Sequence, residues 1–244
     1  MTPPVQSGPF IVIGAGGHAK VLIEALHVMG HTVAGLIAPV SAGTRIFGVP
    51  VLGGDAILPR LRAEGIANAA LGIGDNRLRG ILGEQLITLG FHLPNILHPT
   101  AWISPSSVLG HGVVVLPKAV LSTGATFGRF VIINAGAVIE HDSEIGEAAH
   151  IAPGCALAGN VRVGARTLVG VGSAVRPEIV IGADAVIGAG SVVVRDVPAG
   201  ARVMGNPARQ RVEGPMRQRV ERQMRQRVEG PARPMQTTGP DTVS

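Results

Sequence analysis

From Ile103 to Val193, every sixth residue of the chain is large and apolar, at sixteen positions in a row. Such residues fill well under half of an average chain, so chance does not explain the run. An α-helix repeats every 3.6 residues and a strand every two, so neither element produces this spacing. A period of six is typical of a parallel β-helix, in which six residues form one flat side of a triangular prism and the apolar side chain points inward. Three sides complete a coil, so the run predicts about five stacked coils.

The residues before this run follow other periods. Short apolar runs predict strands at 10–16, 31–38 and 68–75. Helices are expected at 17–30 and 76–90, and in the first of them apolar residues recur at helical spacing at Val21, Leu22, Ala25, Leu26 and Met29. Strands that alternate with helices predict parallel pairing in a small Rossmann-like α/β unit.

The change of period divides the chain into three expected parts. These are a Rossmann-like domain over 1–98, a β-helix domain over 99–210 and a basic low-complexity tail over 211–244. The tail repeats the sequence RQRVE and lacks large apolar residues other than Val and Met, so a solvated segment is expected there.

The composition limits the kind of protein that this chain can be. Hydrophobic residues make up 46% of it and charged residues 15%, which suffices for a packed core. The single Cys155 excludes an internal disulfide framework and suits a reducing compartment. No secretory signal is evident at the N-terminus, and no apolar run reaches the roughly 18 residues of a membrane span. We therefore expect a soluble, cytoplasmic protein without membrane insertion.

Two classes of partner are not expected. Much of the net charge of +5 comes from the tail, the basic residues lack interleaved aromatics, and no nucleic-acid-binding motif is present. The histidines are not clustered at metal-ligand spacing, so no metal is expected either.

A glycine-rich turn follows the first predicted strand and precedes the first predicted helix. Gly14, Gly16 and Gly17 in this turn can bring backbone amides and a helix N-terminus against a phosphate. The same pattern indicates a dinucleotide only weakly, and the strand after the helix ends in LIAPV without the acidic residue that would contact a ribose. The pattern therefore argues against a dehydrogenase.

Several motifs carry a resemblance to a known family. They are IGAGGHAK (13–20), GIGDNRLR (72–79), INAGAVIEHDSEIG (133–146), HIAPGCALAGNVRVG (150–164) and MGNPAR (204–209). The chain resembles the hexapeptide acyltransferases, in the branch that includes the N-acetyltransferases of perosamine and bacillosamine synthesis and the sialic acid O-acetyltransferases. The resemblance covers roughly residues 10–210. It implies a left-handed parallel β-helix, acetyl-CoA as co-substrate and a place in O-antigen or lipopolysaccharide biosynthesis.

The resemblance implies that His141 is a general base and that Asp142, where many relatives carry Glu, is its partner. Imidazole suits this role because its pKa lies near 6.5, and a carboxylate can hold its tautomer. Adjacent residues on a flat side of the prism point to opposite faces, so the pair requires a bend in the chain. A solvated surface histidine beside an unrelated aspartate is the alternative interpretation.

The resemblance also implies a nucleotide-sugar site, formed by Gly14, Gly16, Gly17, His18, Asp75, Asn76 and Asn134. From the residues alone, Asn134 also suits a β-helix corner, because asparagine tolerates left-handed backbone conformations. Gly159 stands one coil of about 18 residues after His141, and the resemblance implies that its amide faces the acetyl carbonyl. A tight corner is a second interpretation of Gly159 and is compatible with the first.

Acetyl-CoA is implied to lie along the β-helix between two subunits. The implied contacts are His150, Ile151, Gly159, Val171, Gly172, Pro177, Arg202 and Arg209. For the two arginines, a role in solubility alone is an equal alternative.

The expected activity is acetyl-CoA-dependent N-acetylation of the 4-amino group of a nucleotide-linked deoxysugar, by direct attack on the thioester. GDP-perosamine is the preferred substrate. A UDP-linked 4-amino sugar and O-acetylation of sialic acid are alternatives, and a non-catalytic hexapeptide scaffold is an alternative of another class. A homotrimer is expected, because one β-helix side exposes backbone and an apolar stripe that cyclic packing covers.

Overall fold

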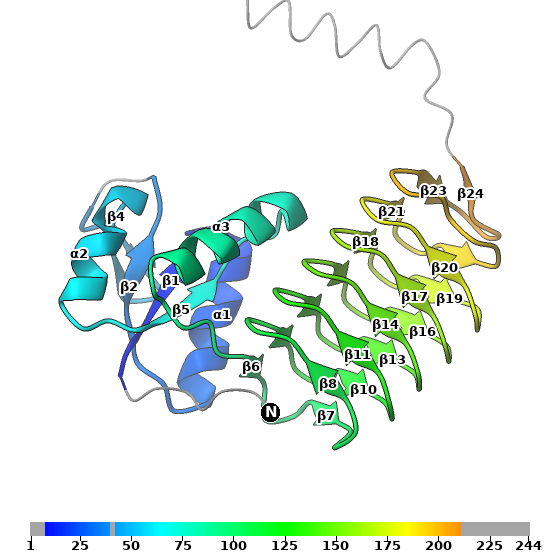
Figure 1. Ribbon diagram of the computed structural model, residues 1–244, viewed down its shortest axis with the longest axis horizontal. Coiled ribbons are helices and arrows are strands. Elements are labelled where there is room, and N and C mark those ends of the chain that lie inside the picture. The colour runs from blue at the N-terminus through cyan, green and yellow to red at the C-terminus, as the bar shows by residue number, and fades with distance from the viewer. Residues whose placement is uncertain (1–7, 40–41, 211–244) are drawn as a thin grey trace, which may run out of the picture. The chain divides into compact units, whose positions relative to one another are not determined.

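The computed structural model describes residues 8–39 and 42–210, and the chain as far as Gln210 forms one compact unit. The expected basic tail at 211–244 lies outside the described residues. Within the unit, an α/β layer precedes a prism of short parallel strands (Figure 1).

The α/β layer is a five-stranded sheet with strand order β3-β4-β2-β1-β5. All pairings are parallel except the hairpin of β3 with β4. The strands are β1 (Phe10–Ile13), β2 (Val33–Ile37), β3 (Arg45–Ile46), β4 (Val49–Gly53) and β5 (Asn68–Leu71). The helices are α1 (Gly17–Val28), α2 (Leu58–Ala63) and α3 (Asn76–Thr88), with a 3-10 turn η1 (Asp55–Ile57) before α2. The expected strands and long helices are present within slightly shorter bounds.

Glycines end both long helices. Gly30 and Gly90 follow α1 and α3 with φ angles of 79° and 82°, and each donates its backbone N–H to a carbonyl of the last helical turn. A left-handed residue in this position closes a helix and favours glycine.

The prism has three faces, and each strand contributes two or three residues to one of them. Face 1 holds β6 (Ile96–Leu97), β9 (Val114–Val115), β12 (Ile132–Ile133), β15 (His150–Ile151), β18 (Leu168–Val169), β21 (Val186–Ile187), β23 (Arg202–Met204) and β24 (Arg209–Gln210). Face 2 holds β7 (Trp102–Ile103), β10 (Val120–Leu121), β13 (Val138–Ile139), β16 (Ala156–Leu157), β19 (Ala174–Val175) and β22 (Val192–Val193). Face 3 holds β8 (Val108–Leu109), β11 (Thr126–Phe127), β14 (Glu144–Ile145), β17 (Arg162–Val163) and β20 (Val180–Ile181).

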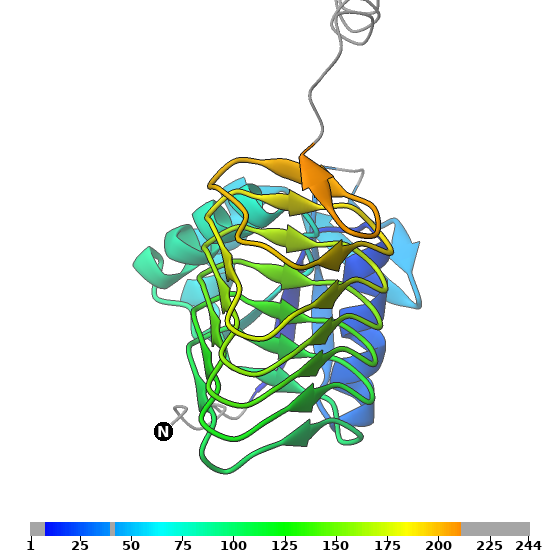
Figure 2. The same cartoon turned by 90° about the vertical axis from the view of Figure 1, so that its right-hand side faces the viewer.

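Successive coils stack in register, as Figure 2 shows. Ile133, for example, pairs in parallel with Val115 of the preceding coil and Ile151 of the next. All three of these side chains are fully buried in a core that runs along the prism. The sixfold apolar period therefore marks the inward position of each strand, as predicted.

The prism extends beyond the predicted run at both ends. It begins at β6, whose Leu97 occupies the apolar position six residues before Ile103. After Val193 the period breaks, and β23 closes the last coil by pairing with β21. The strand β24 then folds back antiparallel on β23.

The α/β layer covers the outside of face 1 over its first coils. The outward side chains of Ile96, Val114 and Ile132 pack in one apolar cluster with residues of α1 such as Leu22. The apolar cluster does not extend to the outward positions of the later coils on this face. These positions are His150, Leu168, Val186 and Arg202, in successive coils. The fold thus leaves an open strip of face 1 beside the α/β layer.

Candidate active site

His141 and Asp142 lie at the corner between face 2 and face 3, in the turn from β13 to β14. Asp142 has a left-handed backbone with φ of 60°, which turns its carboxylate toward the preceding ring. The distance from His141 Nδ1 to Asp142 Oδ2 is 2.8 Å, so the carboxylate accepts the Nδ1–H in that tautomer. Both side chains are mostly exposed. The bend that the pair requires is therefore present, and within the described residues Nε2 has no hydrogen-bond partner.

Gly159 stacks on His141 in the next coil. A Cβ atom built on Gly159 would stand 2.6 Å from both Cε1 and Nε2 of the His141 ring, so only glycine leaves the ring its present place. The backbone N–H of Asn160 donates to the carbonyl of His141, which fixes the two corners together. The backbone N–H of Gly159 has no acceptor within residues 8–39 and 42–210. The same holds for the N–H groups of Thr123 and His141, which occupy the equivalent corner in the two preceding coils. Pro177 occupies the same corner one coil further on.

Asn134 and His150 form a second polar pair, at face 1 and its corner with face 2. Asn134 Nδ2 lies 3.1 Å from His150 Nε2, and Asn134 Oδ1 accepts from the N–H of Ala135. Burial lowers the pKa of His150 to about 4, with the nearby positive charge of Arg79 adding to the effect and a smaller contribution from His18. A neutral imidazole results, which can accept the amide hydrogen of Asn134.

His18 lies in the first turn of α1, beside this pair. Burial and the charge of Arg79 lower the pKa of His18 to about 4. Its Nε2 atom is buried and has no hydrogen-bond partner in the described part of the chain. A buried polar atom without a partner carries an energetic penalty, which a hydrogen bond from a ligand removes.

The glycine turn before α1 shows the expected shape. Gly14 has φ of 103°, and a Cβ there would meet the carbonyl oxygen of Gly72 at 2.9 Å, so the ends of β1 and β5 approach closely. Gly16 is the N-cap of α1, Gly17 begins the helix, and no acidic side chain occupies the first turn. This helix N-terminus is free of an internal anion and suits a phosphate or another acceptor.

Asp75 and Asn76 are both engaged within the protein. Asp75 caps α3 by accepting from the N–H of Leu78 at 2.8 Å. Asn76 donates to the carbonyl of Arg166 on the prism and accepts from the side chain of Arg79. The two residues line the open strip of face 1, and Asn76 also attaches α3 to the prism.

A cleft of about 760 Å³ runs over this strip, between the start of α3 and the later coils. Five of the expected site residues line it: Asp75, Asn76, His150, Val171 and Arg202. Among them Val171 is more than half exposed. The cleft is large enough for an elongated ligand and is lined by both apolar and cationic groups.

The structure does not bring all the expected residues together in one chain. His141, Gly159 and Pro177 share the corner between faces 2 and 3, whereas the cleft lies over face 1 and includes none of them. Gly172 belongs to the corner between faces 1 and 2. Ile151 points into the core and offers only its backbone, and Arg209 is exposed with a hydrogen bond to the neighbouring Ala208 carbonyl.

Charged residues connect α3 with the prism. Arg77 pairs with Asp184 at 3.0 Å, and Asp184 also accepts two hydrogen bonds from Arg166. Arg79 is buried beneath them. A buried arginine in a predicted helix has no distinguishing pattern in one sequence, so these contacts were not predictable.

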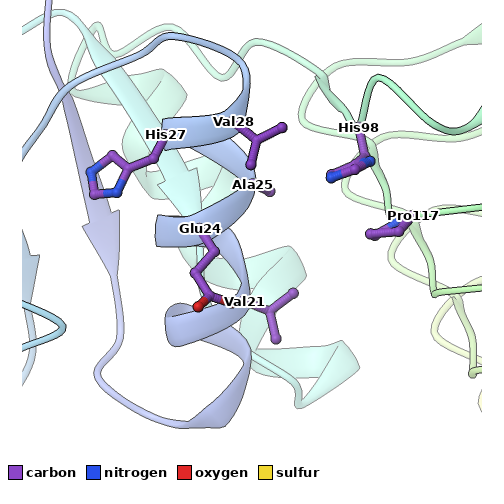
Figure 3. A pocket seen from close by; sticks show the side chains of 7 residues that line it. All are labelled: Val21, Glu24, Ala25, His27, Val28, His98 and Pro117. Carbon is purple, nitrogen blue, oxygen red and sulfur yellow. The ribbon is translucent and has the colours of Figure 1, made fainter.

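A smaller apolar cleft of about 410 Å³ separates α1 from the first coils (Figure 3). It is lined by Val21, Glu24, Ala25, His27, Val28, His98 and Pro117. Val21 was expected on the buried side of this helix, but it is 39% exposed and borders the cleft. The helix turns Ala19 and Ile23 inward instead.

Within the described residues, no group of three or more His, Cys, Asp or Glu side chains is arranged to hold a metal ion. None of the helices described has both the length and the apolar character that a bilayer crossing requires.

Comparisons with known proteins agree with this architecture. Residues 9–86 match the family described as the PglD N-terminal domain. The structure of PerB from Caulobacter crescentus in complex with CoA and GDP-perosamine is 45% identical, with a TM-score of 0.81 over 86% of this chain and 100% of that one. Two variants of perosamine N-acetyltransferase from Caulobacter crescentus, with histidine replaced by asparagine or alanine and with the same two ligands, are each 44% identical with a TM-score of 0.82.

Two further structures extend the likeness. The acetyltransferase domain of PglB from Neisseria gonorrhoeae, in complex with acetyl coenzyme A, is 37% identical over 83% of this chain and 98% of that one, with a TM-score of 0.80. WeeI from Acinetobacter baumannii is 25% identical over 83% of this chain and 99% of that one, with a TM-score of 0.75. The comparison with curated protein sequences finds no match.

Proposed function

The chain belongs to the sugar-nucleotide acetyltransferases with a left-handed β-helix, and we propose that within this family it acetylates the 4-amino group of GDP-perosamine. Acetyl-CoA is its acetyl donor. The sugar assignment is supported by the likeness to a perosamine N-acetyltransferase, which spans the whole of that enzyme. The observation that carries the catalytic proposal is the His141–Asp142 hydrogen bond beneath Gly159.

His141 acts as the general base in this proposal. An amino sugar is mostly an ammonium ion near neutral pH, and its nitrogen gives the extra proton to water before it attacks. As the nitrogen bonds to the thioester carbonyl carbon, Nε2 of His141 takes a proton from it. Asp142 holds Nδ1–H, so that Nε2 is the basic nitrogen, and stabilises the imidazolium that forms. The C–S bond then breaks, and the CoA thiolate that leaves takes its proton from the imidazolium, which returns His141 to its neutral form.

Gly159 supplies the oxyanion contact in the proposed mechanism. Its N–H has no acceptor within the described residues, and its lack of a side chain leaves space beside the His141 ring. A backbone N–H that points at a developing oxyanion is typically worth about 3 kcal/mol in activation free energy.

The substrates are assigned to the two parts of the unit. Residues 1–98 hold the nucleotide sugar at the N-terminus of α1. The buried Nε2 atom of His18, which has no hydrogen-bond partner within the described residues, forms a hydrogen bond with the sugar. Residues 99–210 hold acetyl-CoA along the later coils of the cleft over face 1, where Val171 and Arg202 lie, and His150 lies at the end of this cleft that receives the sugar.

The separation of the His141 corner from the cleft over face 1 supports a homotrimer. The His141 corner and the cleft over face 1 belong to different sides of one prism. If three prisms pack side by side, the His141 corner of one chain meets the face 1 cleft of its neighbour, and each site contains residues of two chains.

The test is release of the CoA thiol from acetyl-CoA with a panel of GDP-, UDP- and dTDP-linked 4-amino sugars and sialic acid. The proposal predicts the highest kcat/KM with GDP-perosamine. Preference for a UDP-linked sugar would assign the chain to the bacillosamine type, and preference for sialic acid would make it an O-acetyltransferase. Absence of thiol release with every acceptor would favour the non-catalytic scaffold.

A further inference from the structure

Arg79 is the largest side chain that is fully buried in the described residues, with 1% of its surface exposed. No carboxylate is among its hydrogen-bond partners. A charge buried without an ion-pair partner is costly unless polar groups surround it. The oxygen atoms that accept hydrogen bonds from Arg79 therefore have to stay within hydrogen-bonding distance of its guanidinium group.

These acceptors come from three segments of the chain, one in the α/β layer and two in the prism. On the α/β side, the guanidinium donates to the carbonyls of Ile73 and Gly74 at 3.2 Å and to Asn76 Oδ1 at 2.9 Å. On the prism side, it donates to the carbonyls of Phe130, Ala148 and Ala149 at 2.9, 2.7 and 3.2 Å.

Two of these segments border the proposed nucleotide-sugar site. The loop of residues 73–76 leads from β5 into α3 and lines the cleft, and Ala149 immediately precedes His150. A planar guanidinium with fixed donor directions sets the distance and the angle between such segments, which a lysine cannot do.

The charge of Arg79 also acts on both buried histidines. The charged and titratable groups that face it are His18 from α1, His150 from β15 and Asp75 at the start of α3. Burial lowers the pKa of each histidine and Arg79 lowers it further. Burial lowers the pKa of Arg79 itself to about 10, so it stays charged at neutral pH.

We propose that Arg79 is a positioning residue of the nucleotide-sugar site, which holds the loop of residues 73–76 against the coil that carries His150. The inference rests on the proposed function, because it assigns the two histidines to the sugar substrate. Neutral imidazoles can both donate to and accept from the hydroxyl and amino groups of a sugar, whereas imidazolium ions can only donate.

Two variants separate the charge of Arg79 from its shape. Arg79→Lys retains a positive charge and loses the planar fork, and Arg79→Met removes both. Arg62→Met is the matched control, because Arg62 also donates to a backbone carbonyl, that of Gly90, but lies in α2 away from the cleft. Each protein is titrated by NMR of the histidine rings, and KM is measured for the nucleotide sugar and for acetyl-CoA.

In the wild type, the signals of His18 and His150 should remain those of neutral rings down to about pH 4. Arg79→Met should raise the pKa of both. Arg79→Lys should leave the pKa values of both histidines low. In this variant KM for the nucleotide sugar should rise roughly tenfold or more, whereas KM for acetyl-CoA should change little. Arg62→Met should alter neither quantity.

Titration of both wild-type histidines near pH 6.5, or an equal KM for the nucleotide sugar in wild type and Arg79→Lys, would overturn the proposal. If Arg79→Met does not fold, the wild type and Arg79→Lys still decide. If no nucleotide sugar is acetylated at all, the proposed function fails, while the histidine titration still tests the electrostatic role of Arg79.

Discussion

The imidazole of His141 lies against the Cα atom of Gly159, one coil further along the prism. There is no space for a methyl group between them, since a Cβ on Gly159 would approach the ring to 2.6 Å. The backbone of Gly159 does not require glycine by its φ angle, because it is not among the residues with positive φ. The glycine is therefore needed for the position of the His141 ring and not for the turn.

Gly159→Ala should consequently impair catalysis without unfolding the protein. The added methyl group displaces an exposed side chain, so the free energy of unfolding should change by no more than about 0.5 kcal/mol. The displaced imidazole should lower kcat roughly tenfold or more. Steady-state kinetics and urea denaturation measure the two quantities.

Gly54→Ala is the matched control for this prediction. Gly54 also has no positive φ, and a Cβ there would meet nothing within 4 Å, far from the His141 corner in the chain. It should retain wild-type kcat. Equal kcat values for both alanine variants would show that the contact of Gly159 with His141 has no part in turnover.

Asp142→Asn tests the partner of the proposed base. Asparagine tolerates the left-handed backbone at φ of 60°, so stability should be retained, whereas alanine would add strain. The amide can donate to Nδ1 and so favour the tautomer with hydrogen on Nε2, which cannot accept the proton of the amine. We expect kcat to fall on the order of 100-fold. An unchanged kcat would mean that the carboxylate plays no part in orienting the ring.

Protein stability should fall as the pH is lowered from 7 toward 4. The pKa values of His18 and His150 are about 4 in the folded protein and 6.5 when the rings are free. The unfolded chain therefore binds more protons than the native chain across this range, and acid favours unfolding. Each histidine should cost about 2 kcal/mol of unfolding free energy between pH 7 and pH 5. Urea denaturation at the two pH values measures this loss.

The variant with both His18→Gln and His150→Gln provides the comparison. Glutamine does not titrate in this range, so the variant should lose several kcal/mol less than the wild type on going from pH 7 to pH 5, on the order of the two contributions together. An identical pH dependence in the two proteins would contradict the buried, neutral state of these rings.

Much of the prism was predictable from the sequence, but the contacts between α3 and the prism were not. The sixfold apolar period depends on local repetition, so it located inward residues such as Ile133 and Ile151 and placed Gly159 above His141 correctly. The period breaks after Val193, and the pairing of β23 with β21 that closes the last coil has no such signal.

The contacts between α3 and the prism depend on residues far apart in the chain. Arg79 donates to the backbone carbonyls of Phe130 and Ala148. Every residue type has a backbone carbonyl, so these hydrogen bonds cannot be predicted from the residue types in one sequence. The resemblance implies a site between two subunits, and within one chain His141 and His150 lie on different parts of the prism.

That separation makes subunit complementation the most direct test of the account. Chains with His141→Asn and chains with His150→Ala are co-expressed, purified as mixed oligomers and assayed for thiol release with GDP-perosamine, beside each variant alone. If every site takes His141 from one chain and His150 from its neighbour, random mixing should restore about a quarter of the wild-type activity. Mixed oligomers that are no more active than the single variants would contradict the shared site.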